Sequence, residues 1–145
     1  MERLLGILRQ YSILTIIILL FIGSQLVTIT HIVREPHPLD WIIHLVFTGF
    51  ISQLVYILLV DYHLVSKQQD KISKFPPARV ILMVWFIGTA VGAWWEIVEF
   101  SLDHIFGLHL QLNNLDTMGD LIADTTGSLL GGISLIFLSQ WREKR

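Results

Sequence analysis

Three aspartates recur every four residues in the stretch NNLDTMGDLIADTTGSLLGG, residues 113–132. These are Asp116, Asp120 and Asp124, and they stand among apolar, small and hydroxyl-bearing residues. Because a helix turns by about 100° per residue, the three carboxylates share an arc of roughly 80° on one helical face. Carboxylates arranged in this way could bind a hard divalent cation, relay protons, or serve as general acid and base.

Two earlier segments offer matching residue types. WWEIVEF places Glu96 and Glu99 three residues apart, and LDWIIH places Asp40 and His44 four residues apart. Either spacing puts both side chains on one helical face. Oxygen-rich sites suit Mg²⁺, Ca²⁺ or Mn²⁺, and one imidazole also allows Zn²⁺. The Glu-x-x-His motif of di-iron bundles is absent. The predicted metal ligands are Asp40, His44, Glu96, Glu99, Asp120 and Asp124.

The composition indicates that these residues lie in a membrane. Of 145 residues, 53% are hydrophobic and only 15% are charged, whereas about a quarter of an average soluble domain is charged. A helix that crosses the hydrocarbon core needs about 20 mostly apolar residues. The sequence therefore predicts an all-α, integral membrane four-helix bundle that forms a single domain over residues 1–145. The four predicted spans are residues 11–29, 39–60, 78–100 and 117–138.

The composition also excludes some classes of site. The chain has no cysteine, which excludes disulfides and thiolate metal sites. We find no basic cluster interleaved with aromatic residues, so no nucleic-acid partner is expected. No nucleotide cofactor is expected either.

The distribution of charge predicts the orientation of the spans. Eight of the ten Lys and Arg residues fall before the first span, between the second and third, or after the fourth. Arg79 stands at the start of the third span on the same side, and Arg34 is the exception. Because basic loops stay inside, both termini should be cytoplasmic, in a multi-pass protein of the cell's inner (cytoplasmic) membrane. Eight of the twelve acids then lie in the outer half. Acids contribute little to topology, so their position needs another explanation.

Small residues predict how the last two spans pack. Gly88 and Gly92 lie four residues apart in the third span, as do Gly127 and Gly131 in the fourth. Such pairs let membrane helices approach closely. We expect the two spans to pack glycine face to glycine face. Their acids would then converge with the polar start of the second span in a pocket that opens outward.

Several nearby residues have simpler interpretations. Asn113 or Asn114 is expected to cap the fourth helix, because Asn is a preferred N-cap residue. Asp116 is expected at the membrane interface, where a carboxylate costs little. Trp94 and Trp95 are interpreted as part of an interfacial aromatic belt.

The segment GAWWEIVEF, followed by residues 113–132, resembles the C-terminal half of VanZ-like membrane proteins. These proteins carry an Asp, an Asn four residues on, a Gly three further and a Gly four further. The corresponding residues here are Asp120, Asp124, Gly127 and Gly131, with Asp124 in place of the usual Asn. The resemblance implies a role in resistance to lipoglycopeptide antibiotics.

The chain also resembles the YjdF-like family of bacterial inner-membrane proteins. That family has a D-x-x-x-H pair that opens an earlier helix, which is matched here by Asp40 and His44. Its W/Y-E-x-x-E segment and its D-T-x-x-D start of a late helix match residues 95–99 and 116–120. The two resemblances cover roughly residues 40–60 and 90–132. They support the site more than any particular activity.

The leading hypothesis is an outward-facing site that binds a divalent cation (Mg²⁺, Ca²⁺, Mn²⁺ or Zn²⁺) and binds or acts on a lipid-linked or amphiphilic headgroup. A catalytic version would be a metal-dependent hydrolase or transferase, with Glu99 and Asp124 as catalytic carboxylates and Glu99 as the base. The alternatives are a cation or proton-coupled transporter, a non-catalytic VanZ-like lipid- or antibiotic-binding protein, and a structural subunit. The expected partners are membrane lipid and an amphiphilic small molecule. A homo-oligomer is also open, and a four-span transporter would need one.

Overall fold

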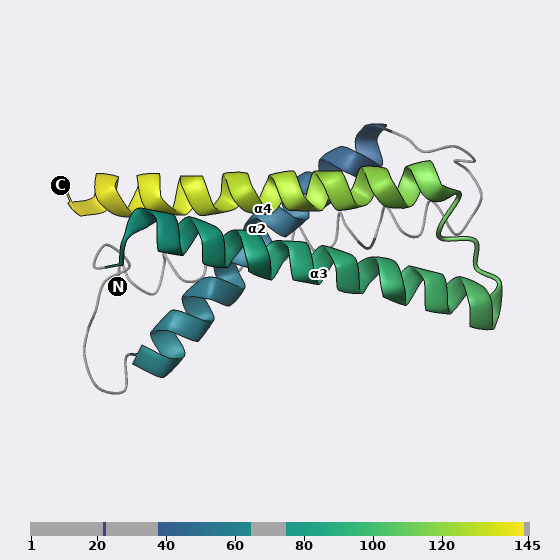
Figure 1. Ribbon diagram of the computed structural model, residues 1–145, viewed down its shortest axis with the longest axis horizontal. Helices are drawn as coiled ribbons and strands as arrows, with labels where there is room; N and C mark the ends of the chain where they lie inside the picture. The colour runs from purple at the N-terminus through teal and green to yellow at the C-terminus, as the bar shows by residue number, and fades with distance from the viewer. Residues whose placement is uncertain (1–21, 23–37, 65–74, 144–145) are drawn as a thin grey trace.

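Three long helices make up most of the described structure, a computed structural model (Figure 1). It describes residue 22, residues 38–64 and residues 75–143. The helices are α2 (Pro38–Leu64), α3 (Pro77–Phe106) and α4 (Asn114–Glu143). Each contains a segment long and apolar enough to cross a membrane: Leu39–Ile57, Pro77–Phe106 and Asn114–Trp141. The all-α prediction is confirmed for these residues. The predicted first span, residues 11–29, lies outside the described residues except for residue 22.

The helix ends follow from local chemistry. Pro77 occupies the first turn of α3, where its missing N–H costs no intrahelical hydrogen bond. Gly107 ends α3 in the left-handed conformation, with φ 63°, and its N–H donates to Asp103 O at 2.9 Å. The helix therefore runs to Phe106, beyond residue 100, where the predicted membrane span ends. The hydropathy pattern marks the part of a helix inside the hydrocarbon core, and the more polar turns beyond it remain helical.

The connection between α3 and α4 is held by two polar side chains. The carboxylate of Asp103 accepts hydrogen bonds from the N–H groups of Leu110 and Gln111, at 2.6 and 2.8 Å. Asn113 Oδ1 accepts hydrogen bonds from the N–H groups of Leu115 and Asp116, at 2.8 and 3.2 Å. One of the two predicted N-caps of α4, Asn113, is thus confirmed.

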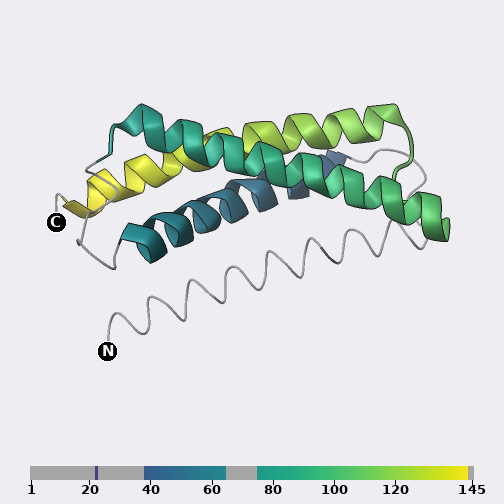
Figure 2. The ribbon, with the colours of Figure 1, turned by 60° about the horizontal axis from the view of Figure 1, so that its bottom comes forward.

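The directions of the helices bring three helix ends together. α2 and α4 run the same way, and α3 runs opposite to both (Figures 1 and 2). The start of α2, the end of α3 and the start of α4 therefore lie at the same end of the bundle. α4 packs along both other helices. All six predicted metal ligands are in these parts of the three helices.

Glycines set the contact between α4 and α2. A Cβ atom added at Gly127 would lie closer than 3.0 Å to the carbonyl oxygen of Leu45, and one at Gly131 would lie 2.5 Å from that of Gly49. Backbone atoms cannot move aside as a side chain can. The two helices can therefore approach this closely only because α4 has no side chain at these positions.

The glycines of α3 face a different part of α4. A Cβ atom at Gly88 would collide with Ser128, and one at Gly92 would collide with Asp124. The expectation that the glycines of the third and fourth spans face each other is therefore wrong. Gly127 is three residues, or about 300°, from Asp124 around the helix. The Gly127 face and the Asp124 face of α4 are thus adjacent. The first packs against α2 and the second against α3.

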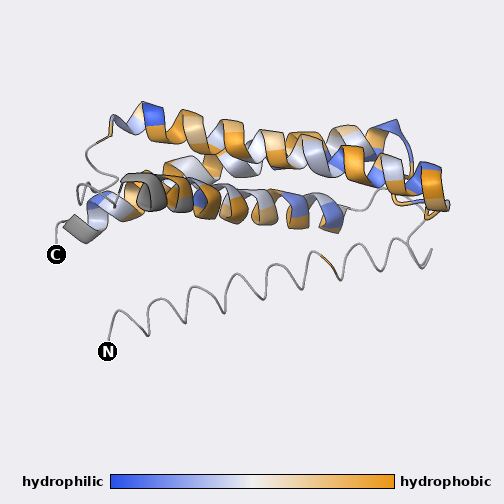
Figure 3. Ribbon diagram, turned by 90° about the horizontal axis from the view of Figure 1, so that it is seen from below, coloured by the Kyte–Doolittle hydropathy of each residue, from blue (hydrophilic) through white to orange (hydrophobic). Residues whose placement is uncertain are grey.

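The outer surface is rich in large apolar side chains and the interior is partly polar. Figure 3 shows hydrophobic residues along all three helices, interrupted by hydrophilic ones. Large apolar side chains point outward, among them Phe86, Trp94 and Phe137, which are 65%, 67% and 70% exposed. Lipid would cover such side chains in a membrane. At the end of the bundle away from the acids, a buried apolar cluster contains Tyr56, Val80, Val84 and Leu135.

Candidate functional site

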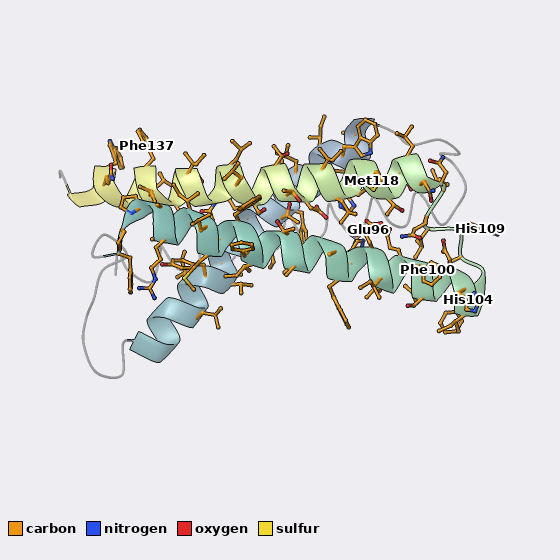
Figure 4. All side chains as sticks on the ribbon, in the orientation of Figure 1. Glu96, Phe100, His104, His109, Met118 and Phe137 are labelled. Carbon is orange, nitrogen blue, oxygen red and sulfur yellow. The ribbon has the colours of Figure 1, made fainter. Side chains whose placement is uncertain are left out.

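Buried ionisable side chains gather where α2 and α4 begin and α3 ends. His44 is 1% exposed, and five acids are between 1% and 6% exposed. The five acids are Glu96, Glu99, Asp116, Asp120 and Asp124. Glu96 lies between α3 and α4 in Figure 4. Buried charges are stable only when they are paired, hydrogen-bonded or bound to a metal, so this concentration needs compensation.

His44 contacts two of these acids through its two ring nitrogens. Nδ1 lies 3.2 Å from Asp124 Oδ1, and Nε2 lies 4.0 Å from Asp120 Oδ1. A carboxylate oxygen can only accept, so Nδ1 donates the hydrogen bond to Asp124. The distance from Nε2 to Asp120 is too long for a hydrogen bond. When the imidazole is neutral, it therefore presents the lone pair of Nε2 on the side of Asp120.

Asp40, His44 and Asp120 together offer a group of metal ligands. One ligand atom from each lies within 4.8 Å of the other two. Asp120 Oδ1 is buried and has no hydrogen-bond partner among the described residues. Metal–ligand bonds of about 2.0–2.6 Å join ligands up to roughly 4–5 Å apart, depending on the ion. Small side-chain movements would therefore close this group on a divalent cation.

The other three predicted ligands lie beside this group. Asp124 contacts the opposite edge of the His44 ring. Glu96 Oε2 accepts a hydrogen bond from Gln111 Nε2 at 3.0 Å, and Glu99 Oε1 accepts one from Trp95 Nε1 at 2.6 Å. The structure thus brings all six predicted residues to one end of the bundle, and three of them have the spacing of metal ligands.

Asp116 lies beside the connection between α3 and α4. It is buried, with 4% of its surface exposed, and its Oδ2 accepts a hydrogen bond from Leu112 N–H at 3.1 Å. Its depth in the membrane stays a prediction, but the carboxylate is covered by protein instead of being exposed to water. The connection between α3 and α4 runs past this carboxylate and covers it, which no local sequence pattern indicates.

Sequence reasoning missed other buried polar residues. Thr48, Ser52 and Ser128 are at most 2% exposed and lie deeper in the bundle than the acids. Each hydroxyl donates to a backbone carbonyl of its own helix. The four-residue spacing from His44 to Thr48 to Ser52 was a signal that could have found two of them. Gln111 had no such signal, because its bond to Glu96 depends on the path of the connection.

Comparisons with known proteins extend over nearly the whole chain. A family model described as "Predicted membrane protein (DUF2238)" matches residues 5–143, which include α2, α3 and the candidate site. No curated protein and no solved structure matches the chain. The resemblance to VanZ-like and YjdF-like proteins remains a prediction. The protein is a membrane protein with three candidate spans among the described residues. The chain belongs to the DUF2238 family of predicted membrane proteins.

Proposed function

We propose that this membrane protein binds a divalent cation through Asp40, His44 and Asp120, and uses it to bind or modify the headgroup of a lipid-linked or amphiphilic molecule. The observation that carries the proposal is the buried Oδ1 of Asp120. It has no hydrogen-bond partner among the described residues and lies 4.0 Å from His44 Nε2. A cation between these two atoms would compensate a charge that is otherwise costly to bury.

The ligand types narrow the choice of cation. Two carboxylates suit Mg²⁺, Ca²⁺ and Mn²⁺, and imidazole is a common ligand of Zn²⁺. The mixture favours Mn²⁺ or Zn²⁺. Three protein ligands leave coordination positions open for water or for an oxygen of the headgroup.

The lipid part of the proposal is supported by what surrounds the site. The face of α3 that turns away from Glu96 and Glu99 carries exposed Trp94, Ile97 and Phe100. An amphiphile whose chains cover such a surface would have its headgroup near the level of the acids. The resemblance to VanZ-like proteins points in the same direction.

A catalytic role would use a carboxylate that is not a ligand. A bound cation can polarise a phosphoryl oxygen or activate a water molecule, and a nearby base then accepts a proton. Glu99 suits the base better than Asp124, because the hydrogen bond of Asp124 holds the proposed ligand His44, whereas that of Glu99 comes from Trp95, which is not a ligand. The reaction would be hydrolysis or group transfer at the headgroup.

Binding is better supported than transport. Below the acids, the buried hydroxyls of Thr48, Ser52 and Ser128 donate to backbone carbonyls. Further along the described helices, the interior passes into the apolar cluster around Val80 and Val84. A cation that crossed between α2, α3 and α4 would meet this cluster.

The test is equilibrium binding of Mn²⁺ to the full chain in lipid nanodiscs. We expect the wild type to bind the ion and Asp120→Asn to bind it at least about tenfold more weakly, because a direct ligand is lost. Asp103→Asn is the matched control. It removes a charge at the same end of the bundle, but Asp103 binds backbone N–H groups instead of joining the ligand group. The absence of binding by the wild type to both Mn²⁺ and Zn²⁺, or equal losses in the two variants, would refute the site.

A further inference from the structure

We infer that Asp124 is a positioning residue that orients His44, not a ligand, and that Gly92 of α3 makes room for it. The inference rests on the proposed cation site. α3 supplies none of the three proposed ligands. Through Gly92, it would nevertheless help to set the orientation of the His44 imidazole. Asp124 also differs in role from Asp120, although the two lie one turn apart on the same helix.

The hydrogen bond from His44 selects one form of the ring. Because Nδ1 donates to Asp124 Oδ1, neutral His44 carries its proton on Nδ1 and its lone pair on Nε2. Metal-binding histidines almost always donate the N–H of the other ring nitrogen in this way, and this bond fixes both the tautomer and the ring orientation. Asp124 is on the side of the ring away from Asp120, so it cannot bind the same cation without giving up this bond.

The loss of Asp124 would favour a competing arrangement. If the proton moved to Nε2, that N–H would face Asp120 Oδ1, which is now 4.0 Å away. A small movement would then form a hydrogen bond between the two ligands, and the lone pair that a cation needs would point elsewhere. Asp124 thus favours the ring form that can bind metal over the form that pairs with Asp120.

Gly92 determines where the Asp124 carboxylate can lie. Asp124 is 1% exposed, and its Oδ2 has no hydrogen-bond partner among the described residues. A Cβ atom at Gly92 would come closer than 3.0 Å to the Oδ2, Cβ and Cγ atoms of Asp124. Since these atoms include Cβ, rotation of the carboxylate alone would not relieve the collision. An alanine at position 92 must therefore displace the side chain or the helix that carries it.

The first test reads the tautomer directly. The full chain, labelled with ¹⁵N-histidine in nanodiscs without metal, is examined by NMR, and the His44 signals are assigned by their absence in His44→Gln. At a pH where the His44 ring is neutral, we expect a protonated Nδ1 and an unprotonated Nε2 in the wild type. Asp124→Leu should move the proton to Nε2 and weaken Mn²⁺ binding by about 10–100-fold. Asp124→Asn keeps an acceptor oxygen. It should therefore keep the His44 proton on Nδ1 and retain most of the Mn²⁺ affinity.

The outcomes separate the two proposals. If Asp124 were a ligand, Asp124→Asn would lose as much affinity as Asp124→Leu, and the inference would be overturned. An unchanged tautomer in Asp124→Leu would overturn it as well. A wild type that binds no metal would refute the cation site. The NMR result in the metal-free protein would still show whether Asp124 orients His44.

The second test uses two glycines of α3. Gly92→Ala should shift the His44 nitrogen signals and weaken Mn²⁺ binding. Gly88→Ala is the matched control, because its Cβ collides with Ser128 and not with Asp124. Both substitutions disturb the contact of α3 with α4. If they changed the His44 signals equally, or if neither did, the assigned role of Gly92 would be wrong.

Discussion

The buried acids differ, residue by residue, in what compensates their charge. Glu96 accepts from an amide, Glu99 from an indole, and Asp116 from a backbone N–H. Asp124 accepts from an imidazole, whereas Asp120 Oδ1 accepts from none of the described residues. Neutral donors and a cation are alternative ways to stabilise a buried carboxylate. Asp120 is therefore where a bound cation should have its largest effect.

The hydrogen bond from Trp95 to Glu99 can be tested against its sequence neighbour. Trp95→Phe removes the 2.6 Å bond and leaves the 3% exposed Glu99 with one donor fewer. We expect the free energy of unfolding to fall by about 1–3 kcal/mol, measured by denaturation in mixed micelles. Trp94→Phe alters a side chain that is 67% exposed and should change stability by no more than about 0.5 kcal/mol. Similar losses in both variants would mean that Trp95 acts only as an interfacial aromatic residue.

The membership of individual residues in the candidate site could be predicted in part. Asp40, His44 and Asp120 stood out because charge in an apolar segment is costly and needs a reason. Six metal ligands were predicted, and only Asp40, His44 and Asp120 have ligand spacing. That the other three lie beside this group could not be predicted. It depends on the rotation of α2 against α4, and His44 and Asp124 are 80 residues apart. The interpretation of Trp95 as a belt residue missed its bond to Glu99 for a similar reason, because the rotamer decides which group the indole reaches.

At the scale of helices, the contact between α2 and α4 aligns the proposed ligands. Asp40 and His44 belong to α2 and Asp120 belongs to α4, so the spacing of the group depends on how closely these helices approach. Gly49, Gly127 and Gly131 form this contact largely through backbone atoms. Sequence reasoning identified two of these glycines as packing residues but paired their helix with α3. The small-xxx-small pattern marks a close contact without naming the partner helix.

A series of alanine substitutions on α4 should follow the contacts at each glycine. A Cβ added at Gly127 would have the shortest contact, with a backbone atom of α2. The nearest atom would be 2.5 Å away for a Cβ at Gly131 and 3.0 Å away for one at Gly132. We expect losses of unfolding free energy in the same order, with at least about 1–3 kcal/mol at Gly127. Gly127→Ala should also weaken Mn²⁺ binding, because it pushes α2 away from Asp120. A ranking with Gly132→Ala as the most destabilising variant would contradict this account.

At the scale of the whole molecule, the orientation in the membrane remains a prediction. The chain contains no cysteine, so single cysteines can report on each side without background. Asn114→Cys is at the start of α4, near the acids, and Gln140→Cys is close to its other end. Because basic residues favour the cytoplasm, we expect an impermeant maleimide added to intact cells to label Asn114→Cys and not Gln140→Cys. The reverse pattern would place the candidate site on the cytoplasmic side.

The distance along the chain between His44 and Asp124 affects how the protein is made. At about 5–20 residues per second, a ribosome needs roughly 4–16 s to add the 80 residues that separate them. During that interval α2 can enter the bilayer with Asp40 and His44 before their partners on α4 exist. A newly made chain therefore acquires the proposed cation site only when α4 arrives. Ion retention would then distinguish finished copies from chains whose translation stopped early.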